Sequence, residues 1–423
     1  MTTADFIVRR VRTLFTCAGP APRRGPAQRD AGAIADGAVA AWGGTIVFVG
    51  SSEECDRTVV PTEDARQIEG RGCTLLPGFV DPHTHLVFAG NRHEEVRRRL
   101  AGASYAEIAA AGGGIVATVE ATRAATEDDL VEASRARLDE MLACGTTTCE
   151  VKSGYGLTLE AELKMLRVIR RLDRDHAIDV VPTFMGAHEI PVEYRDRRRD
   201  YVDLIVEGMI PMVAREGLAE WCDVFCERGV YTPDESREIL EAGLRAGLRP
   251  RIHADELGPS GGSLVAAAVG ARSADHLVHV PPEGVRALAA AGTVATLLPP
   301  AAFYLKLGRY PPARDLIAAG VPVALATDVN PGGGFSPSMP FAMALACFGM
   351  DLTFEEALVG ATLNAAYSLD RHETAGSLEV GKPLDAVLVR GEPIDLMRVG
   401  ASAISAVFKR GRQVHPSPSA PAM

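Results

Sequence analysis

Cysteine is scarce in this chain of 423 residues, which contains eight of them. That number is too small for a fold held together by disulfides. The two closest pairs, Cys144/Cys149 and Cys222/Cys226, lack the second ligand pair that a structural zinc site requires. Most of the cysteines lie inside apolar stretches, so we expect reduced, buried thiols and a cytoplasmic protein.

Long apolar runs are also missing. The longest, such as residues 339–350, fall short of the ~18 residues that a membrane-spanning helix needs. The apolar positions of segment 1–17 are interrupted by Arg9, Arg10 and Arg12, unlike the continuous core of a signal peptide. The sequence therefore predicts no membrane partner.

The chain also lacks an excess of positive charge. The chain has 44 Lys and Arg against 55 Asp and Glu, a net charge of −11, which argues against nucleic acid as a partner. The 47% hydrophobic and 23% charged fractions are typical of globular proteins and exclude disorder for most of the chain. A local basic pocket for an acidic small molecule stays possible.

Both ends of the chain have the pattern of short strands and loops. Segments 38–42 and 45–49 flank Gly43-Gly44 and predict a β-hairpin. Segment 18–30, rich in Pro, Gly and Arg, predicts an exposed loop. We expect residues 1–77 and 375–415 to form one small β-sandwich domain and residues 416–423 a disordered tail.

Between these ends, in residues 78–374, short apolar runs alternate with amphipathic stretches. Eight runs centre near Val80, Thr147, Pro182, Val224, Ile252, Leu277, Ala295 and Leu325. Helices are predicted over 129–143, 158–172, 232–246, 284–291 and 312–319. Eight strand–helix units favour an α/β fold, a (β/α)8 TIM barrel. A doubly wound sheet is the alternative, but no Gly-x-Gly-x-x-Gly follows the first run.

Polar residues cluster where these runs end, which in a barrel is the catalytic face. His83 and His85 are two residues apart after the first run, so their side chains point the same way. His253 and Asp328 end later runs. Together these four residues offer three nitrogens and one carboxylate with room for a water, which predicts a metal site.

These motifs resemble the amidohydrolase superfamily of barrel metallohydrolases, and within it the imidazolonepropionase family of histidine degradation. The resemblance covers residues 5–415 and rests on segments 81–92, 150–156, 186–189, 253–256 and 327–332, with His276 and the return segment 376–385. Two departures are Leu384, where the superfamily often has Ala, and Gly333, where a small hydroxyl residue is commoner.

The resemblance implies one metal ion, because the modified Lys that bridges two metals at strand four is absent here. Its ligands are expected to be His83, His85, His253 and Asp328, and zinc or iron suits them. The metal is expected to activate a water, with Glu256, His276 and Asp328 as the catalytic residues that share the proton transfers and stabilise the oxyanion.

The implied substrate is 4-imidazolone-5-propanoate, whose ring amide is hydrolysed to N-formimidoyl-L-glutamate. Arg92 is expected to bind the propanoate, because a guanidinium binds a carboxylate through two hydrogen bonds. The other expected contacts with substrate or product are Tyr155, His188, Glu256, Asn330, Gly332 and Gly333. A homodimer is expected from the resemblance. The alternatives are a cytosine- or guanine-type deaminase and a non-catalytic barrel homologue.

Overall fold

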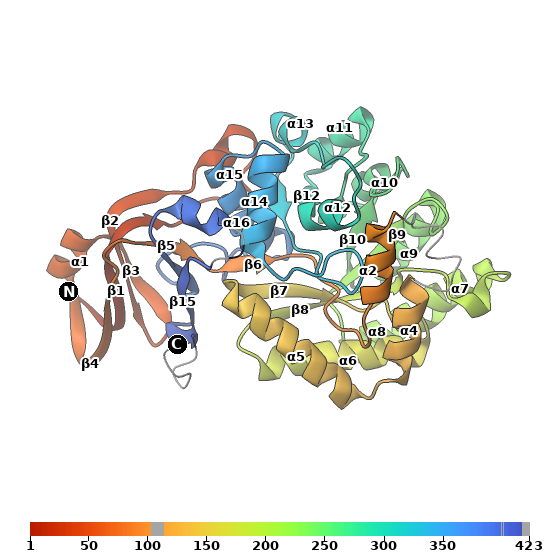
Figure 1. Ribbon diagram of the computed structural model, residues 1–423, viewed down its shortest axis with the longest axis horizontal. Helices are drawn as coiled ribbons and strands as arrows, with labels where there is room; N and C mark the ends of the chain where they lie inside the picture. The colour runs from red at the N-terminus through yellow and green to blue at the C-terminus, as the bar shows by residue number, and fades with distance from the viewer. Residues whose placement is uncertain (103–113, 399, 401, 417–423) are drawn as a thin grey trace.

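The protein is described by a computed structural model over residues 1–102, 114–398, 400 and 402–416. Its strands form two sheets, one drawn from the middle of the chain and one from its two ends (Figure 1). In Figure 1 the end strands, red and blue, lie together on the left, and the remaining strands and most helices form the body on the right. No described helix combines the length and apolarity needed to cross a membrane.

The central sheet is a parallel barrel whose described strands follow chain order. They are β6 Phe79–Asp81, β7 Thr146–Lys152, β8 Asp179–Ala187, β9 Trp221–Cys226, β10 Arg249–Ala254, β11 Ser273–His276, β12 Val294–Leu297 and β13 Val323–Leu325. Nearly every residue in these strands is buried. Continuous burial is expected for parallel strands covered on both faces, and the predicted barrel is confirmed.

The barrel closes just beyond the ends of its first and last strands. Thr84 and Val329 form a parallel bridge, and the amide of Asp328 donates to the carbonyl of His83 over 3.1 Å. Below the bridge, the carboxylate of Asp81 accepts from the amide and the hydroxyl of Thr327 at 3.1 and 2.5 Å. The closure thus joins the two segments that carry predicted metal ligands.

Most helices surround the barrel, whereas α1, Ser52–Thr58, packs against the strands of the chain ends (Figure 1). Those after the first strands are α2 His93–Leu100, α4 Ile115–Ala124, α5 Glu127–Ala143, α6 Leu159–Asp175, α7 Arg198–Asp203, α8 Ile210–Glu216, α9 Pro233–Arg245 and α10 Gly262–Ala268. The later ones are α11 Pro282–Ala291, α12 Pro299–Tyr304, α13 Ala313–Ala318, α14 Met339–Gly349, α15 Phe354–Gly360 and α16 Leu363–Ser368.

The five predicted helices appear as α5, α6, α9, α11 and α13, with ends shifted by at most three residues. Two of them begin where a threonine caps the helix and a carboxylate three residues later accepts from the backbone of the cap. These caps are Thr126 with Asp129 and Thr232 with Glu235. The same type of cap, Thr353 with Glu356, begins α15, which the sequence analysis did not predict.

The second sheet mixes strands from both chain ends and is centred on β1, Thr2–Phe15. Its other strands are β2 Ala33–Trp42, β3 Thr45–Ser51, β4 Val59–Glu69, β5 Cys73–Pro77, β14 Ala386–Arg390, β15 Ile404–Lys409 and β16 Arg412–His415. The predicted hairpin is β2–β3, and its turn residues Gly43 and Gly44 both have positive φ, at 56° and 83°.

The predicted exposed loop at 18–30 is wrong in part. Residues Gly25–Arg29 form a single turn of 3-10 helix, and Gln28 within it is fully buried. The amide of Gln28 pairs with the backbone N–H and carbonyl of Val323 in β13, at 3.2 and 3.0 Å. The domain boundaries remain predictions, and apart from Pro416 the tail at 416–423 lies outside the described residues.

One buried lysine ties the two sheets together. Lys409 of β15 is 4% exposed, and its ammonium lies 2.7 Å from Asp385, 2.7 Å from Asp179 at the start of β8, and 2.9 Å from the carbonyl of Thr147 in β7. A charge buried this way is stable only with its partners, so each group depends on the others.

We predict that Lys409→Met lowers the free energy of unfolding by about 3–5 kcal/mol, because it leaves the buried carboxylate of Asp385 without its cation. Denaturant unfolding of the metal-loaded protein measures the change. The exposed Arg412→Met, on the adjacent strand, is the matched control and is expected to change stability by less than about 0.5 kcal/mol. Equal stabilities of the two variants would contradict the role of Lys409.

Candidate active site

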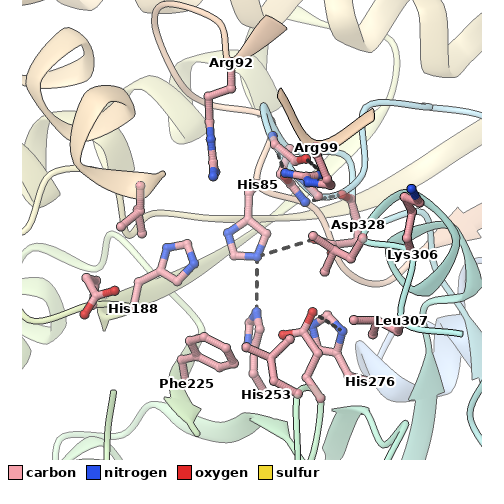
Figure 2. Close-up of a pocket in the computed structure, with 18 of the residues that line it drawn as sticks. His85, Arg92, Arg99, His188, Phe225, His253, His276, Lys306, Leu307 and Asp328 are labelled. Atoms are coloured by element: carbon pink, nitrogen blue, oxygen red, sulfur yellow. Dashed lines mark hydrogen bonds and ion pairs between the residues drawn. The ribbon is translucent and has the colours of Figure 1, made fainter. Parts of the chain in front are cut away.

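A cavity of about 490 Å³ opens at the carboxyl ends of the barrel strands. Every predicted site residue except His83 lines it, and His83 lies directly beneath. Figure 2 shows His85, His188, His253, His276 and Asp328 directed toward one centre, with Arg92 reaching in from above.

Three imidazoles converge at the floor of the cavity. The Nε2 atom of His85 lies 3.3 Å from that of His83 and 3.2 Å from that of His253. Oδ1 of Asp328 is 3.7 Å from Nε2 of His83 and 3.8 Å from Nε2 of His85. The three imidazoles therefore converge on one point, and the carboxylate of Asp328 lies beside it.

Two carboxylates behind the imidazoles decide which ring nitrogen carries the proton. Nδ1 of His83 lies 2.7 Å from Asp275, and Nδ1 of His253 lies 3.0 Å from Asp223. Each Nδ1–H donates to its carboxylate, so each Nε2 presents a lone pair to the cavity. Burial also holds the pKa of His83 well below the usual imidazole range, which keeps the ring neutral.

Both lone pairs face Nε2 of His85 at 3.3 and 3.2 Å, and a proton on that atom can pair with only one of them, so the other still needs a cation. Neutral imidazoles with an adjacent carboxylate are a ligand set that a transition metal ion prefers. The residues thus fit a metal ion, and the group His83, His85 and His253 is the one found within the described residues.

A buried ionic network lies behind the ligands. Nζ of Lys152 is 2.7 Å from Glu150 and 2.8 Å from Asp223, and the guanidinium of Arg251 is 3.3 Å from Asp275. All five side chains are fully buried. Lys152 therefore faces the carboxylates beneath the imidazoles, where it holds Asp223 against His253.

Glu256 and His276 stand on the opposite wall from Arg92. Oε1 of Glu256 lies 3.4 Å from Nδ1 of His276. Burial, with the nearby charge of Asp328, raises the pKa of Glu256 well above its usual range. Both His276 and Asp328 have positive φ, 73° and 54°, a strained conformation that is typical of functional sites.

His188 and Tyr155 form one side of the cavity. The ring of His188 stacks on His85 at 4.8 Å, and its Nδ1 donates to the carbonyl of Gly154 over 3.0 Å. Burial lowers the pKa of His188 to about 3, so the ring is neutral. The ring of Tyr155 lies 5.2 Å from that of His188.

The glycine loop has internal bonds that the sequence analysis did not predict, and its expected contacts with substrate or product remain predictions. The backbone N–H groups of Gly332 and Gly333 both donate to Oδ1 of Asn330, at 2.9 and 2.6 Å, and Nδ2 of Asn330 donates to the carbonyl of Asp328. The amide and N–H groups expected to bind a carboxylate are thus engaged with each other. In this structure they brace the loop that carries Asp328.

Several residues of the site were not singled out by the sequence analysis. They include the outer carboxylates Asp223 and Asp275, and Glu95 and Arg99 beside Arg92. A signal existed for Asp223, which is the one charged residue in the buried strand 221–226. A buried carboxylate requires a hydrogen-bond or ion-pair partner, so the sequence could have predicted that Asp223 is paired, though not with which residue.

Comparison with known proteins places the chain among its relatives. Residues 74–415 match the amidohydrolase family. The chain is 50% identical over 418 residues, 98% of each chain, to an imidazolonepropionase from Symbiobacterium thermophilum. The chain belongs to the amidohydrolase family, among the imidazolonepropionases. It is also 50% identical over 386 residues to the imidazolonepropionase from Geobacillus kaustophilus, covering 90% of this chain and 91% of that one.

Solved structures show the same fold at lower identity. Guanine deaminase from E. coli superposes with a TM-score of 0.71 at 18% identity, covering 97% of this chain and 99% of the other. An adenosine deaminase from Xanthomonas campestris with bound zinc has a TM-score of 0.70 at 17% identity, covering 97% and 93%. At these identities the likeness concerns the fold alone.

The outer carboxylates give a prediction on metal retention. Asp223→Asn is expected to weaken metal affinity about 10–100-fold, because the amide no longer holds the His253 proton at Nδ1. Metal content after dialysis against graded chelator concentrations measures this. The same change at exposed Asp234 is the control and should leave metal content unaltered. Equal retention in both variants would argue against the orienting role.

Proposed function

We propose that this chain catalyses the imidazolonepropionase reaction of histidine degradation, the hydrolysis of 4-imidazolone-5-propanoate to N-formimidoyl-L-glutamate. The observation that carries the proposal is a single cavity that combines the histidine cluster, a buried carboxyl group and an arginine. The full-length identity of 50% to imidazolonepropionases supports it independently.

A metal ion, which we propose to be zinc or iron, would be held by His83, His85, His253 and Asp328 and would supply Lewis-acid activation of water and of the ring carbonyl. The orientation of two of the Nε2 atoms, those of His83 and His253, depends on the chain itself, through Asp275 and Asp223. These two ligands are therefore ordered before the ion binds.

Glu256 is the proposed proton carrier. It takes a proton from the attacking water and returns it to the ring nitrogen as the carbonyl C–N bond breaks, so one water is consumed and a carboxylate and a freed nitrogen result. The raised pKa of Glu256 suits a group that both accepts and donates a proton near neutral pH. His276, 3.4 Å away, orients this carboxyl group and faces the developing oxyanion.

The substrate ring is proposed to lie against Tyr155 and His188, and its propanoate against Arg92. His188 is neutral and fixed by its bond to Gly154, so it offers a polar but uncharged contact to the ring. Arg92 lies across the cavity from His276 (Figure 2), the ring that contacts Glu256. We further propose a cytoplasmic homodimer, since closed twofold dimers are the commonest assembly.

We predict that the purified protein accelerates the loss of ring ultraviolet absorbance of freshly made 4-imidazolone-5-propanoate. Removing the metal with a chelator should abolish the activity, and zinc or iron should restore it, because the ligand cluster needs a cation. No acceleration over buffer would refute the proposal. Ammonia release from guanine or cytosine would instead support the deaminase alternative.

Glu256→Gln is expected to lower kcat by about 100-fold or more, with metal content unchanged, since the amide cannot exchange a proton. The exposed Glu283→Gln serves as the matched control and should retain full activity. Steady-state kinetics and metal analysis on both variants test the assignment, and a kcat for Glu256→Gln close to that of the control would remove Glu256 from the mechanism.

A further inference from the structure

One carboxylate at the mouth of the cavity is shared by two arginines. Glu95 lies on α2, and its partners Arg92 and Arg99 lie three residues before it and four after it. Glu95 is 6% exposed and Arg99 is 7% exposed. Burial raises the pKa of Glu95, but the hydrogen bond from Arg92, the N–H of Gly114 and the charges of both arginines lower it below its usual value, so Glu95 is an anion.

Glu95 holds the guanidinium of Arg92 along one edge. Nε of Arg92 donates to Oε2 of Glu95 over 2.8 Å, and its Nη2 donates to Oε1. The same carboxylate accepts from the backbone N–H of Gly114 at 2.8 Å and from Nη2 of Arg99 at 3.0 Å. With these four bonds the position of the carboxylate is fixed.

The face of the Arg92 guanidinium lies against Gly332. A Cβ placed on Gly332 would be 2.3 Å from Cζ of Arg92, so the glycine leaves the space that the guanidinium fills. Arg99 completes the arrangement, because its Nη1 donates to the carbonyl of Gly332 at 2.9 Å and to that of Tyr304 at 3.3 Å. The network thus connects α2 to the loop that carries Asp328.

We propose that Glu95 is a positioning residue that makes the cavity selective for ring compounds bearing a carboxylate, by fixing the edge that Arg92 presents. Arg99 bonds both to Glu95 and to the loop that carries the proposed metal ligand Asp328, and so holds the edge of Arg92 at a fixed position relative to that loop. The inference rests on the proposed function for the identity of the substrate, and on the contacts of Glu95 for the selectivity.

Two effects of Glu95 on an anionic ligand have opposite signs. Its negative charge opposes the binding of a carboxylate, whereas its hydrogen bonds hold Arg92 in the geometry for a bidentate contact. Loss of the charge alone would strengthen binding of the acid. Loss of the geometry would weaken it, and the four bonds to a buried carboxylate make the geometric effect the larger one.

The test compares two stable probes on the metal-loaded, full-length protein: 3-(imidazol-4-yl)propanoate and its uncharged propanamide. Calorimetry gives the ratio of the amide Kd to the acid Kd. We expect a ratio of roughly 10–100 for the unaltered protein and about 1 for Arg92→Ala. For Glu95→Gln the ratio should be about fivefold or more below that of the unaltered protein. The ratio should fall because the Kd of the acid rises, with the Kd of the amide unchanged.

Three further variants sharpen the result. Arg92→Ala combined with Glu95→Gln should have the ratio of Arg92→Ala alone, since Glu95 acts through Arg92. Glu94→Gln, at an exposed neighbour, should retain the full ratio. Glu95→Asp keeps the charge but shortens the side chain, so it separates geometry from charge and replaces Glu95→Gln if that variant does not fold. It should also lower the ratio.

Tighter binding of the acid by Glu95→Gln, or an unchanged ratio in both Glu95 variants, would overturn the inference. Neither outcome would affect the proposed hydrolysis, which the unaltered protein tests by itself. Conversely, a protein that selects the acid through Glu95 but does not hydrolyse 4-imidazolone-5-propanoate would refute the proposed function and leave the inference standing.

Discussion

The convergence of three buried imidazole lone pairs is the constraint on which the rest of the site depends. The Nε2 atom of His85 lies within about 3.3 Å of the Nε2 atoms of both His83 and His253, which is unfavourable without a cation. Two carboxylates, Asp275 and Asp223, fix the tautomers of His83 and His253. The fold thus prepares a site that fits a metal ion before any substrate is considered.

The contacts that close the barrel also hold two of the proposed metal ligands in place. The amide of Asp328 bonds to the carbonyl of His83, and Thr84 bridges Val329, so the seam between the first and last strands runs through the ligands. Asp81 secures the seam through Thr327. A change that opens the barrel there would therefore also move the proposed ligands His83 and Asp328, so the stability of the seam is coupled to the site.

The sequence predicted the barrel and the residues that meet at its carboxyl end, because burial and strand ends leave a periodic pattern. It did not predict pairing across strands. Asp223 reaches His253 from a neighbouring strand, and nothing local reveals that contact. The bonds from the N–H groups of Gly332 and Gly333 to Asn330 were not predicted for a similar reason, since they form only in the folded turn.

The charges around the site explain why we assign the attraction for a substrate carboxylate to Arg92. Behind the proposed ligands, the carboxylates of Glu150, Asp223 and Asp275 contact neutral imidazoles and the cations of Lys152 and Arg251, which leaves one negative charge. An ionised Asp328 would bring the total to two, which balances a divalent ion and leaves no excess to attract an anion. The attraction proposed for a substrate carboxylate therefore depends on Arg92 and Arg99, two guanidinium groups that share Glu95.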